Sequence, residues 1–224
     1  MNGLASALHA TNLAVHIAAG AVAMAIGVAL VARAKGTRWH LRAGAWYARF
    51  AIVVSASAAV GTLAFRYIPL FATLTVLTMY QLFSGWRDAR RKAAPPAGID
   101  LVAALVAIGF AAAIVPTLLG GPHIGSSTPV VVFSTLGALG MLVIYDLARF
   151  AFPSGWHARL WRYSHTYKLI SSLAAMMSAL AGNVVRAGQP WSQIAPSAIG
   201  MIAILWMFVV IARKRATPPP GLRR

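Results

Sequence analysis

The sequence has no cysteine and no glutamate, and only three of its 224 residues are acidic. The lack of cysteine excludes disulfides, thiolate metal sites, thiol nucleophiles and covalent c-type haem attachment. The sequence also has no Gly-rich phosphate loop, no His-Glu-x-x-His zinc motif and no nucleophile elbow, so we do not expect hydrolase chemistry. Any functional site must therefore be built from His, Asp, Lys, Tyr or Ser side chains, or from a bound cofactor.

Charged residues are equally scarce, at 10% of the chain, whereas hydrophobic residues make up 59%. A helix needs about 20 mostly apolar residues to cross a hydrocarbon core roughly 30 Å thick. The apolar runs reach this length repeatedly and do not alternate as barrel strands would, so they predict helices. We predict an all-α polytopic membrane protein with seven transmembrane helices: Thr11–Ala32, Ala43–Phe65, Tyr67–Trp86, Leu101–Leu119, Pro129–Leu147, His165–Val185 and Ala195–Ala212.

The positions of the cations predict how these helices are oriented. Except for Arg66 and Arg186, the 20 Lys and Arg residues fall into four clusters that apolar runs separate. The positive-inside rule places all four in the cytoplasm, the N-terminus outside and the C-terminus in the cytoplasm. The clusters are Arg33, Lys35, Arg38, Arg42 and Arg49; Arg87, Arg90, Arg91 and Lys92; Arg149, Arg159, Arg162 and Lys168; and Arg213, Lys214, Arg215, Arg223 and Arg224.

The segments between the helices are too short for another domain. We therefore expect one transmembrane domain, residues 1–212, and a basic, Pro-rich cytoplasmic tail, residues 213–224. No cation precedes the first helix and no cleavage site follows it, so we expect it to stay in the mature chain. The net charge of +17 lies in short loops at one face. It predicts contact with anionic lipid headgroups at the cytoplasmic face, and no nucleic acid.

The first candidate site residue is His16, which the sequence places in the outer half of the first helix. It lies about 25 Å along the helix axis from Arg33, at about 1.5 Å per residue. Two interpretations stay open: a neutral histidine that is hydrogen-bonded to a neighbouring helix, or a functional residue. As a ligand it could pair only with an outer histidine, either His9 or His123.

A second group of candidates lies at the inner connection before the second helix. There the sequence places His40 at the start of the helix, where free N–H groups favour an anion that Lys35 and Arg42 would also attract. The alternative is an interfacial belt, in which the arginines extend to lipid phosphate and Trp39 lies at headgroup depth.

The third candidate is Asp146, at the inner end of the fifth helix. A carboxylate in a span costs roughly 2.5–3.5 kcal/mol, so it should have a partner. We predict either a structural ion pair or a functional site, whereas Asp88 and Asp100, in or beside loops, are predicted to have no special role. The candidate partners of Asp146 all lie on the inner side: Arg149, Arg42, His40, His165 and Lys168.

These residues carry a resemblance to a known family. The motif Lys-Gly-x-x-x-His-x-Arg-x-Gly, residues 35–44, follows a helix that bears a histidine. Together with Asp146 and His165 it resembles a family of predicted bacterial membrane proteins catalogued only as a domain of unknown function. Lys168 departs from that pattern, because an apolar residue is expected after the histidine. The resemblance implies a bacterial inner membrane location and this set of polar positions, but no reaction.

The chain is more distantly similar to cytochrome b561-like membrane proteins, whose helical bundles bind haem through histidines on facing helices. The resemblance implies that cations at the rim neutralise the haem propionates. We predict a redox cofactor, b-type haem or quinone, that serves electron transfer and is bound by His16, His40, Arg42, Asp146 and His165. His40 and His165 are the candidate haem iron ligands, because both begin helices on the same face.

Two other classes of function remain open. The chain could be a transporter or binder of a small anionic or amphipathic molecule, with the inner basic groups and Asp146 as a gate. It could also be an accessory subunit without chemistry of its own, packed against other proteins of a membrane complex.

Overall fold

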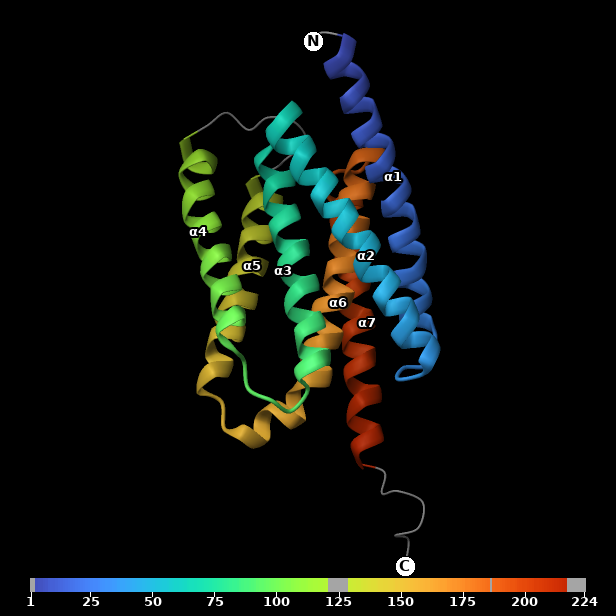
Figure 1. Cartoon of the computed structure of the whole chain (residues 1–224), viewed down its shortest axis with the longest axis vertical. Helices are drawn as coiled ribbons and strands as arrows, with labels where there is room; N and C mark the ends of the chain where they lie inside the picture. Colours follow the sequence, from blue (N-terminus) through green and yellow to red (C-terminus); the bar gives the residue numbers. More distant parts are fainter. Residues whose placement is uncertain (1–2, 121–128, 186, 217–224) are drawn as a thin grey trace, which may run out of the picture.

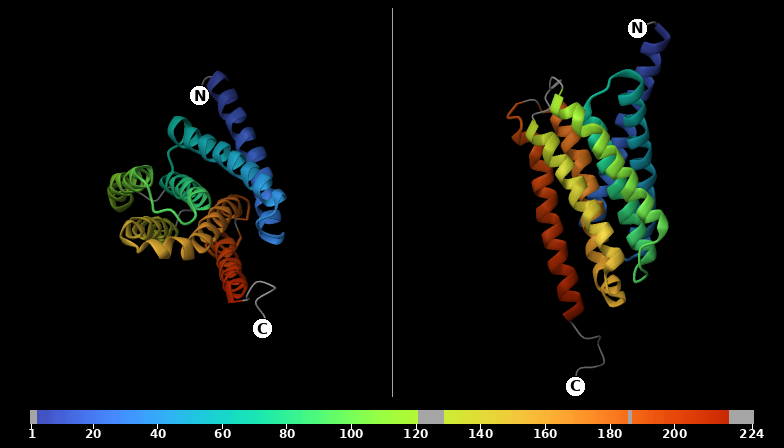
Figure 2. Two further views of the ribbon diagram at one scale, coloured as in Figure 1. Left: turned by 60° about the horizontal axis from the view of Figure 1, so that its bottom comes forward. Right: turned by 90° about the vertical axis from the view of Figure 1, so that its left-hand side faces the viewer.

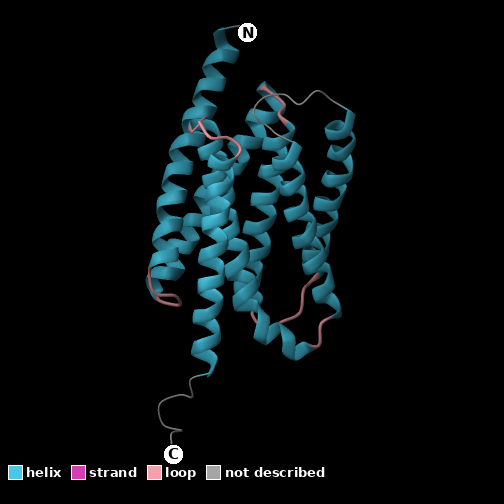
Figure 3. Cartoon of the chain, turned by 180° about the vertical axis from the view of Figure 1, so that it is seen from behind, coloured by secondary structure: helices cyan, strands magenta, loops and turns pink. Residues whose placement is uncertain are grey.

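The computed structural model describes residues 3–120, 129–185 and 187–216, and within these residues the chain is all-helical, without strands (Figure 3). A π-helical turn (Gly61–Phe65) continues the second helix, and a 3₁₀ turn (Arg149–Ala151) follows the fifth. The described α-helices are α1 (Gly3–Ala32), α2 (Arg38–Val60), α3 (Pro69–Arg91), α4 (Gly98–Gly120), α5 (Pro129–Ala148), α6 (Ser154–Val184) and α7 (Trp191–Ala216).

Successive helices run in opposite directions along one bundle, so the two termini lie at opposite ends (Figure 1). The α1–α2, α3–α4 and α5–α6 connections lie at the same end as the last turn of α7. This end, which we call the basic end, carries Lys and Arg residues of all four clusters seen in the sequence.

The helices α3 and α6 form the centre of the bundle, with α1 and α2 on one side, α4 and α5 on another, and α7 against α6 (Figure 2). Small residues allow close approach at these contacts. A Cβ on Gly27 of α1 would lie 2.7 Å from the Leu173 side chain, and one on Gly200 of α7 would lie 2.6 Å from the Cβ of Ala174. The lack of a side chain on each glycine therefore sets the spacing of α1 and α7 from α6.

Local sequence signals explain where several helices begin. The Thr37 side chain accepts a hydrogen bond from the backbone N–H of His40, which caps α2. Gly36 before it has φ +79°, which a residue without a Cβ adopts easily. Pro69 occupies the first turn of α3, where its missing N–H costs no helical hydrogen bond.

In the part of the chain that the structure describes, five helices are long and apolar enough to cross a membrane by length and composition. The central helices α3 and α6 are not among them, because they bury polar side chains inside the bundle. Those of α3 include Gln81, Ser84 and Asp88, and those of α6 include Lys168 and Ser172.

The predicted limits of these two helices are wrong. The helix α3 does not end at Trp86 but continues to Arg91, and α6 begins at Ser154, well before His165. Both extra segments have one buried and one exposed face, so they lie outside the uniformly apolar runs that hydropathy detects. The helix α7 also continues past the predicted boundary at residue 212, to Ala216.

Candidate functional site

Asp146 is buried at the end of α5 and accepts hydrogen bonds from α3, from α6 and from the 3₁₀ turn that follows α5. Its Oδ1 accepts hydrogen bonds from Nζ of Lys168 at 2.5 Å and from Nη1 of Arg149 at 3.4 Å. Its Oδ2 accepts from the hydroxyls of Ser84 at 2.5 Å and Tyr80 at 3.0 Å. Of the candidate partners that the sequence offers, the structure therefore gives Asp146 the cations Lys168 and Arg149.

Asp88 of α3 is the second buried carboxylate, with 2% of its surface exposed. It accepts hydrogen bonds from Nη1 of Arg149, from Nζ of Lys168 at 2.9 Å and from the hydroxyl of Ser164 at 2.5 Å. The prediction that Asp88 lies in or beside a loop without a special role is wrong, because α3 continues past it. Polar residues at a spacing of four, Tyr80, Ser84 and Asp88, mark one stripe of α3 and are the sequence signal for this site.

Lys168 of α6 links the two carboxylates and is completely buried, with 0% exposed. Its ammonium donates three hydrogen bonds, to Asp88, to Asp146 and to the hydroxyl of Ser84, the last at 2.5 Å. We call Asp88, Asp146, Arg149 and Lys168 the charge cluster. Its two anions and two cations balance, as buried charges require.

A small cavity adjoins the charge cluster between α3, α4 and α5. Its volume is about 10 Å³, which is about enough for one water-sized group. The chain's three acidic residues all line this cavity, although they come from three helices. Its lining residues are Tyr80, Phe83, Ser84, Arg87, Asp88, Arg91, Pro96, Asp100, Ala103, Asp146 and Arg149.

Asp100, in the first turn of α4, closes one side of this cavity with Arg87 of α3. Its carboxylate accepts two parallel hydrogen bonds from Arg87, at 2.7 Å from Nε and 2.9 Å from Nη2, and a third at 2.7 Å from the backbone N–H of Ala97. The pair therefore ties α4 to α3, a role that the sequence prediction did not assign to Asp100.

His40 and His165 lie at matching positions on two helices that run in the same direction. Each lies seven residues, or about two turns, before a residue of the buried hydrogen bond between Tyr47 of α2 and Ser172 of α6, which measures 2.8 Å. The two imidazoles therefore lie near the same level, and they are within electrostatic range of each other. Nδ1 of His165 donates to the Gly85 carbonyl at 2.9 Å, and Nδ1 of His40 is buried without a partner among the described residues.

His165 lies near the charge cluster along the chain. It precedes Lys168 by three residues on α6, and its Nδ1 bonds the Gly85 carbonyl, three residues before Asp88 on α3. Arg42, which is also one of the predicted site residues, is exposed, and no hydrogen bond or ion pair among the described residues joins it to the others. Neither histidine lines the cavity.

His16 lies apart from both groups, on α1. Its Nδ1 lies 3.1 Å from the Val54 carbonyl and 3.0 Å from the Ser57 hydroxyl, both on α2. These contacts agree with a histidine that links neighbouring helices by hydrogen bonds. His9, a possible partner, packs against the ring of Phe65, and His123 lies outside the described residues. Within the described ranges, no group of three or more His, Asp or Glu residues could hold a metal ion.

Lys35 does not turn toward the start of α2. Its ammonium donates to the carbonyls of Leu30, Val31 and Arg33 at the end of α1, at 2.6, 2.7 and 2.7 Å. Burial and the nearby Lys214 lower the pKa of Lys35 below its ordinary value. It therefore caps α1, and is not available for an anion at the N-terminus of α2.

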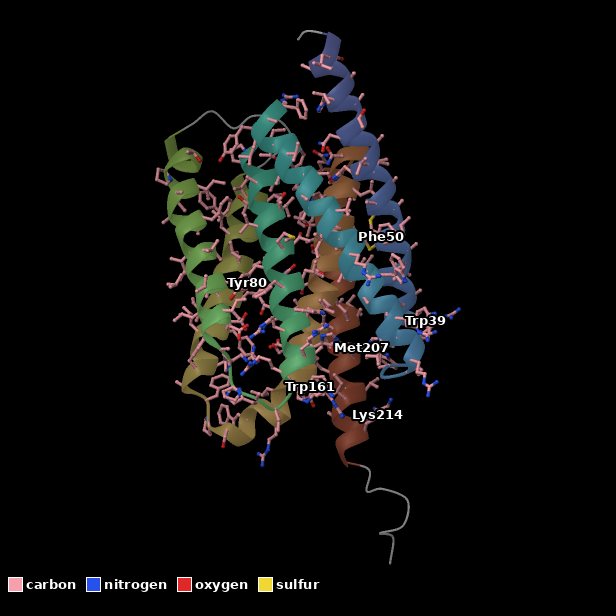
Figure 4. All side chains as sticks on the ribbon, viewed as in Figure 1. Trp39, Phe50, Tyr80, Trp161, Met207 and Lys214 are labelled. Atoms are coloured by element: carbon pink, nitrogen blue, oxygen red, sulfur yellow. The ribbon has the colours of Figure 1, made fainter. Side chains whose placement is uncertain are left out.

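Arginine side chains stack on tryptophans around the basic end. Figure 4 shows Trp39, Trp161 and Lys214 toward this end of the bundle. The arrangement agrees with the interfacial-belt interpretation, because tryptophans prefer headgroup depth and arginines extend to phosphate. The stacked pairs are Arg33 on Trp39, Arg49 on Trp46, Arg90 on Trp86 and Arg162 on Trp161, with 4.3–5.3 Å from guanidinium carbon to ring centre.

The sequence matches no protein-family model, and comparisons of the chain with curated proteins and with solved structures also find no match. The two family resemblances described above therefore stay predictions. Function has to be argued from the histidine pair, the charge cluster and the cavity.

Proposed function

We propose that the chain is an integral protein of the bacterial inner membrane, with seven spans, its N-terminus outside and the basic end in the cytoplasm. The five long apolar helices support a location in a membrane. The Arg–Trp pairs at one end support the orientation. Anionic headgroups are then the natural partners of the basic end. A fluorescent protein fused to the C-terminus should glow and alkaline phosphatase at the same place should be inactive; the reverse result would contradict the orientation.

Within this frame, we propose that the protein binds a redox cofactor for electron transfer, a b-type haem held between His40 and His165. The observation that carries the proposal is the shared level of the two imidazoles, seven residues before the Tyr47–Ser172 hydrogen bond on parallel helices. A quinone hydrogen-bonded to the same histidines is the alternative cofactor. Transport of a small anion and an accessory role remain the alternatives in other classes.

The donor chemistry fits a haem. Neutral imidazole is a common haem ligand, and a ligating histidine usually donates its other ring N–H to a carbonyl or carboxylate. His165 already donates Nδ1–H to Gly85, so Nε2 is the nitrogen left for iron. His40 has an unpartnered Nδ1 and so has no competing bond that would fix its ring elsewhere. When bound, the haem would supply one-electron transfer between ferric and ferrous iron.

An absorption spectrum of the purified chain after haem-replete expression tests the proposal. We expect a Soret band that shifts with dithionite, and its loss in His40→Ala and His165→Ala. His157→Ala is the matched control and should keep the band, because His157 is a buried histidine of α6 that lies eight residues before His165 and, like His40, has an Nδ1 without a partner among the described residues. Wild-type protein without a band would eliminate the haem, and quinone assayed in an organic extract would then test the alternative cofactor.

A further inference from the structure

Arg149 has hydrogen-bonding capacity that the charge cluster does not use. A guanidinium carries five N–H donors, and Arg149 uses only Nη1, toward Asp88 and Asp146. No described residue accepts a hydrogen bond from its Nε or Nη2. The side chain is 9% exposed and lines the cavity. A buried guanidinium that lines an open space therefore has one edge without a partner among the described residues.

The carboxylates around this cavity are, by contrast, all in use. Every carboxylate oxygen of Asp88, Asp100 and Asp146 accepts at least one hydrogen bond from the protein. Lys168 uses all three of its N–H donors. The unfilled capacity beside the cavity thus belongs to cationic donors, which is the arrangement that favours an acceptor with negative charge.

Two further arginines of α3 add to this imbalance. Arg91 donates one hydrogen bond, from Nε to the Pro95 carbonyl at 2.7 Å. Arg87 donates from Nε and Nη2 to Asp100. Each therefore has a terminal nitrogen that donates to no described residue. Three arginines and three aspartates line the cavity. Lys168, bonded to two of those aspartates, leaves one positive charge in excess.

We propose that this cavity is a binding site for an oxyanion, a phosphate or carboxylate group, held by Nε and Nη2 of Arg149. These two atoms form the side edge of the guanidinium, whose parallel N–H bonds match two oxygens of such a group. Arg87 uses the same edge for Asp100 in this structure. The volume of about 10 Å³ has room for about one oxygen, so one of the two oxygens that the guanidinium edge binds lies inside the cavity, and the rest of the ligand lies outside it.

The site differs from the proposed haem position, because neither His40 nor His165 lines the cavity. Its lining includes Arg91 and Pro96, at the α3–α4 connection of the basic end (Figure 1). The phosphate can therefore come from two sources at that face, free inorganic phosphate or the headgroup of an anionic phospholipid.

Equilibrium binding of radiolabelled inorganic phosphate to the full chain in phosphatidylcholine nanodiscs tests the free-ligand source. Potassium chloride at equal ionic strength is the control for screening. A second arm compares the thermal midpoint of unfolding in phosphatidylcholine nanodiscs with that in nanodiscs containing phosphatidylglycerol. Saturable phosphate binding identifies the free ligand. A rise in the midpoint with phosphatidylglycerol that Arg91→Gln reduces and Arg90→Gln does not identifies the lipid.

Three variants decide whether the ligand is bound by the proposed residues. Arg149→Lys keeps a charge beside Asp88 but lacks the two-pronged edge, and it should weaken binding at least about tenfold. Arg91→Gln removes a second cation that lines the cavity and should also weaken binding. Arg90→Gln is the matched control, because Arg90 is on the same helix but stacks on Trp86 and does not line the cavity. It should leave the affinity unchanged.

Several results would overturn the proposal. One is the absence of both saturable phosphate binding and a phosphatidylglycerol effect on the wild-type chain. Another is equal weakening by Arg91→Gln and Arg90→Gln, which would indicate charge attraction without a defined site. A third is competition by chloride at the same concentration as phosphate. If Arg149→Lys does not fold, the comparison of Arg91→Gln with Arg90→Gln decides alone.

Discussion

Replacing Lys168 by Met tests the central role of the charge cluster. Met keeps the length and most of the volume of the lysine side chain, which packs against Gly85, but removes the ammonium. The change leaves Asp88 and Asp146 buried, and Arg149 is then the one described residue that forms an ion pair with them. Two carboxylates then share one guanidinium, which lies 3.4 Å from Asp146.

The expected loss of stability follows from the contacts that disappear. Lys168 makes three charge-assisted hydrogen bonds and has 0% of its surface exposed. Breaking a buried ion pair by removing one partner costs about 3–5 kcal/mol. We therefore expect the free energy of unfolding to fall by about that amount, a change of roughly a thousandfold in the ratio of folded to unfolded protein.

Unfolding of the purified chain by titration with sodium dodecyl sulfate, followed by circular dichroism, measures this loss. The exposed Lys92→Met is the control and should change the free energy by less than about 0.5 kcal/mol. The double variant with Lys168→Met and Asp146→Asn should recover at least about 1 kcal/mol, because the unpaired carboxylate is neutralised. A loss below about 1 kcal/mol for Lys168→Met, or no recovery in the double variant, would refute the electrostatic reasoning.

Three further variants test packing and hydrogen bonds with the same titration. Gly85→Ala should cost about 1–3 kcal/mol, because its Cβ would lie 2.9 Å from the Cβ of Lys168, whereas Gly44→Ala, with nothing within 4 Å, should be neutral or stabilising; equal effects would contradict the packing. Tyr47→Phe removes the hydrogen bond to Ser172 and should cost about 0.5–1.5 kcal/mol. His16→Ala should cost about 1 kcal/mol through its lost bonds to α2. Loss of the Soret band in this variant would instead make His16 a cofactor ligand.

The sequence predicts the all-helical architecture well, because each long apolar run can satisfy its backbone only as a helix in lipid. It predicts less well the two central helices. Their polar residues lower the hydropathy, although Ser84, Asp88 and Lys168 are among the most buried in the described chain. Hydropathy measures the average preference of a segment for lipid, and it cannot separate a polar residue in a loop from one that faces another helix.

The charge cluster depends on which helices are neighbours, and a single sequence does not contain that information. Asp146 and Arg149 are three residues apart, so their proximity is predictable from helix geometry. Asp88 and Lys168 are 80 residues apart along the chain. Their contact follows from the packing of α3 against α6 at Gly85, where a Cβ would lie 3.0 Å or less from Lys168 and Leu169. Gly85 is thus the local feature that permits the ion pair.

The distribution of acids explains how the bundle is held together. Each aspartate in a span would cost roughly 2.5–3.5 kcal/mol without a partner, and each of the three pairs with a cation on another segment of the chain. These pairs join α3 to α4, α3 to the 3₁₀ turn after α5, and α5 to α6. The helices α1 and α7 instead pack on α6 through Gly27 and Gly200. Asp100→Asn, which removes the ion pair with Arg87, should therefore loosen α4 first. Hydrogen exchange of this variant should show earlier loss of protection in α4 than in α1, and the opposite order would contradict this division.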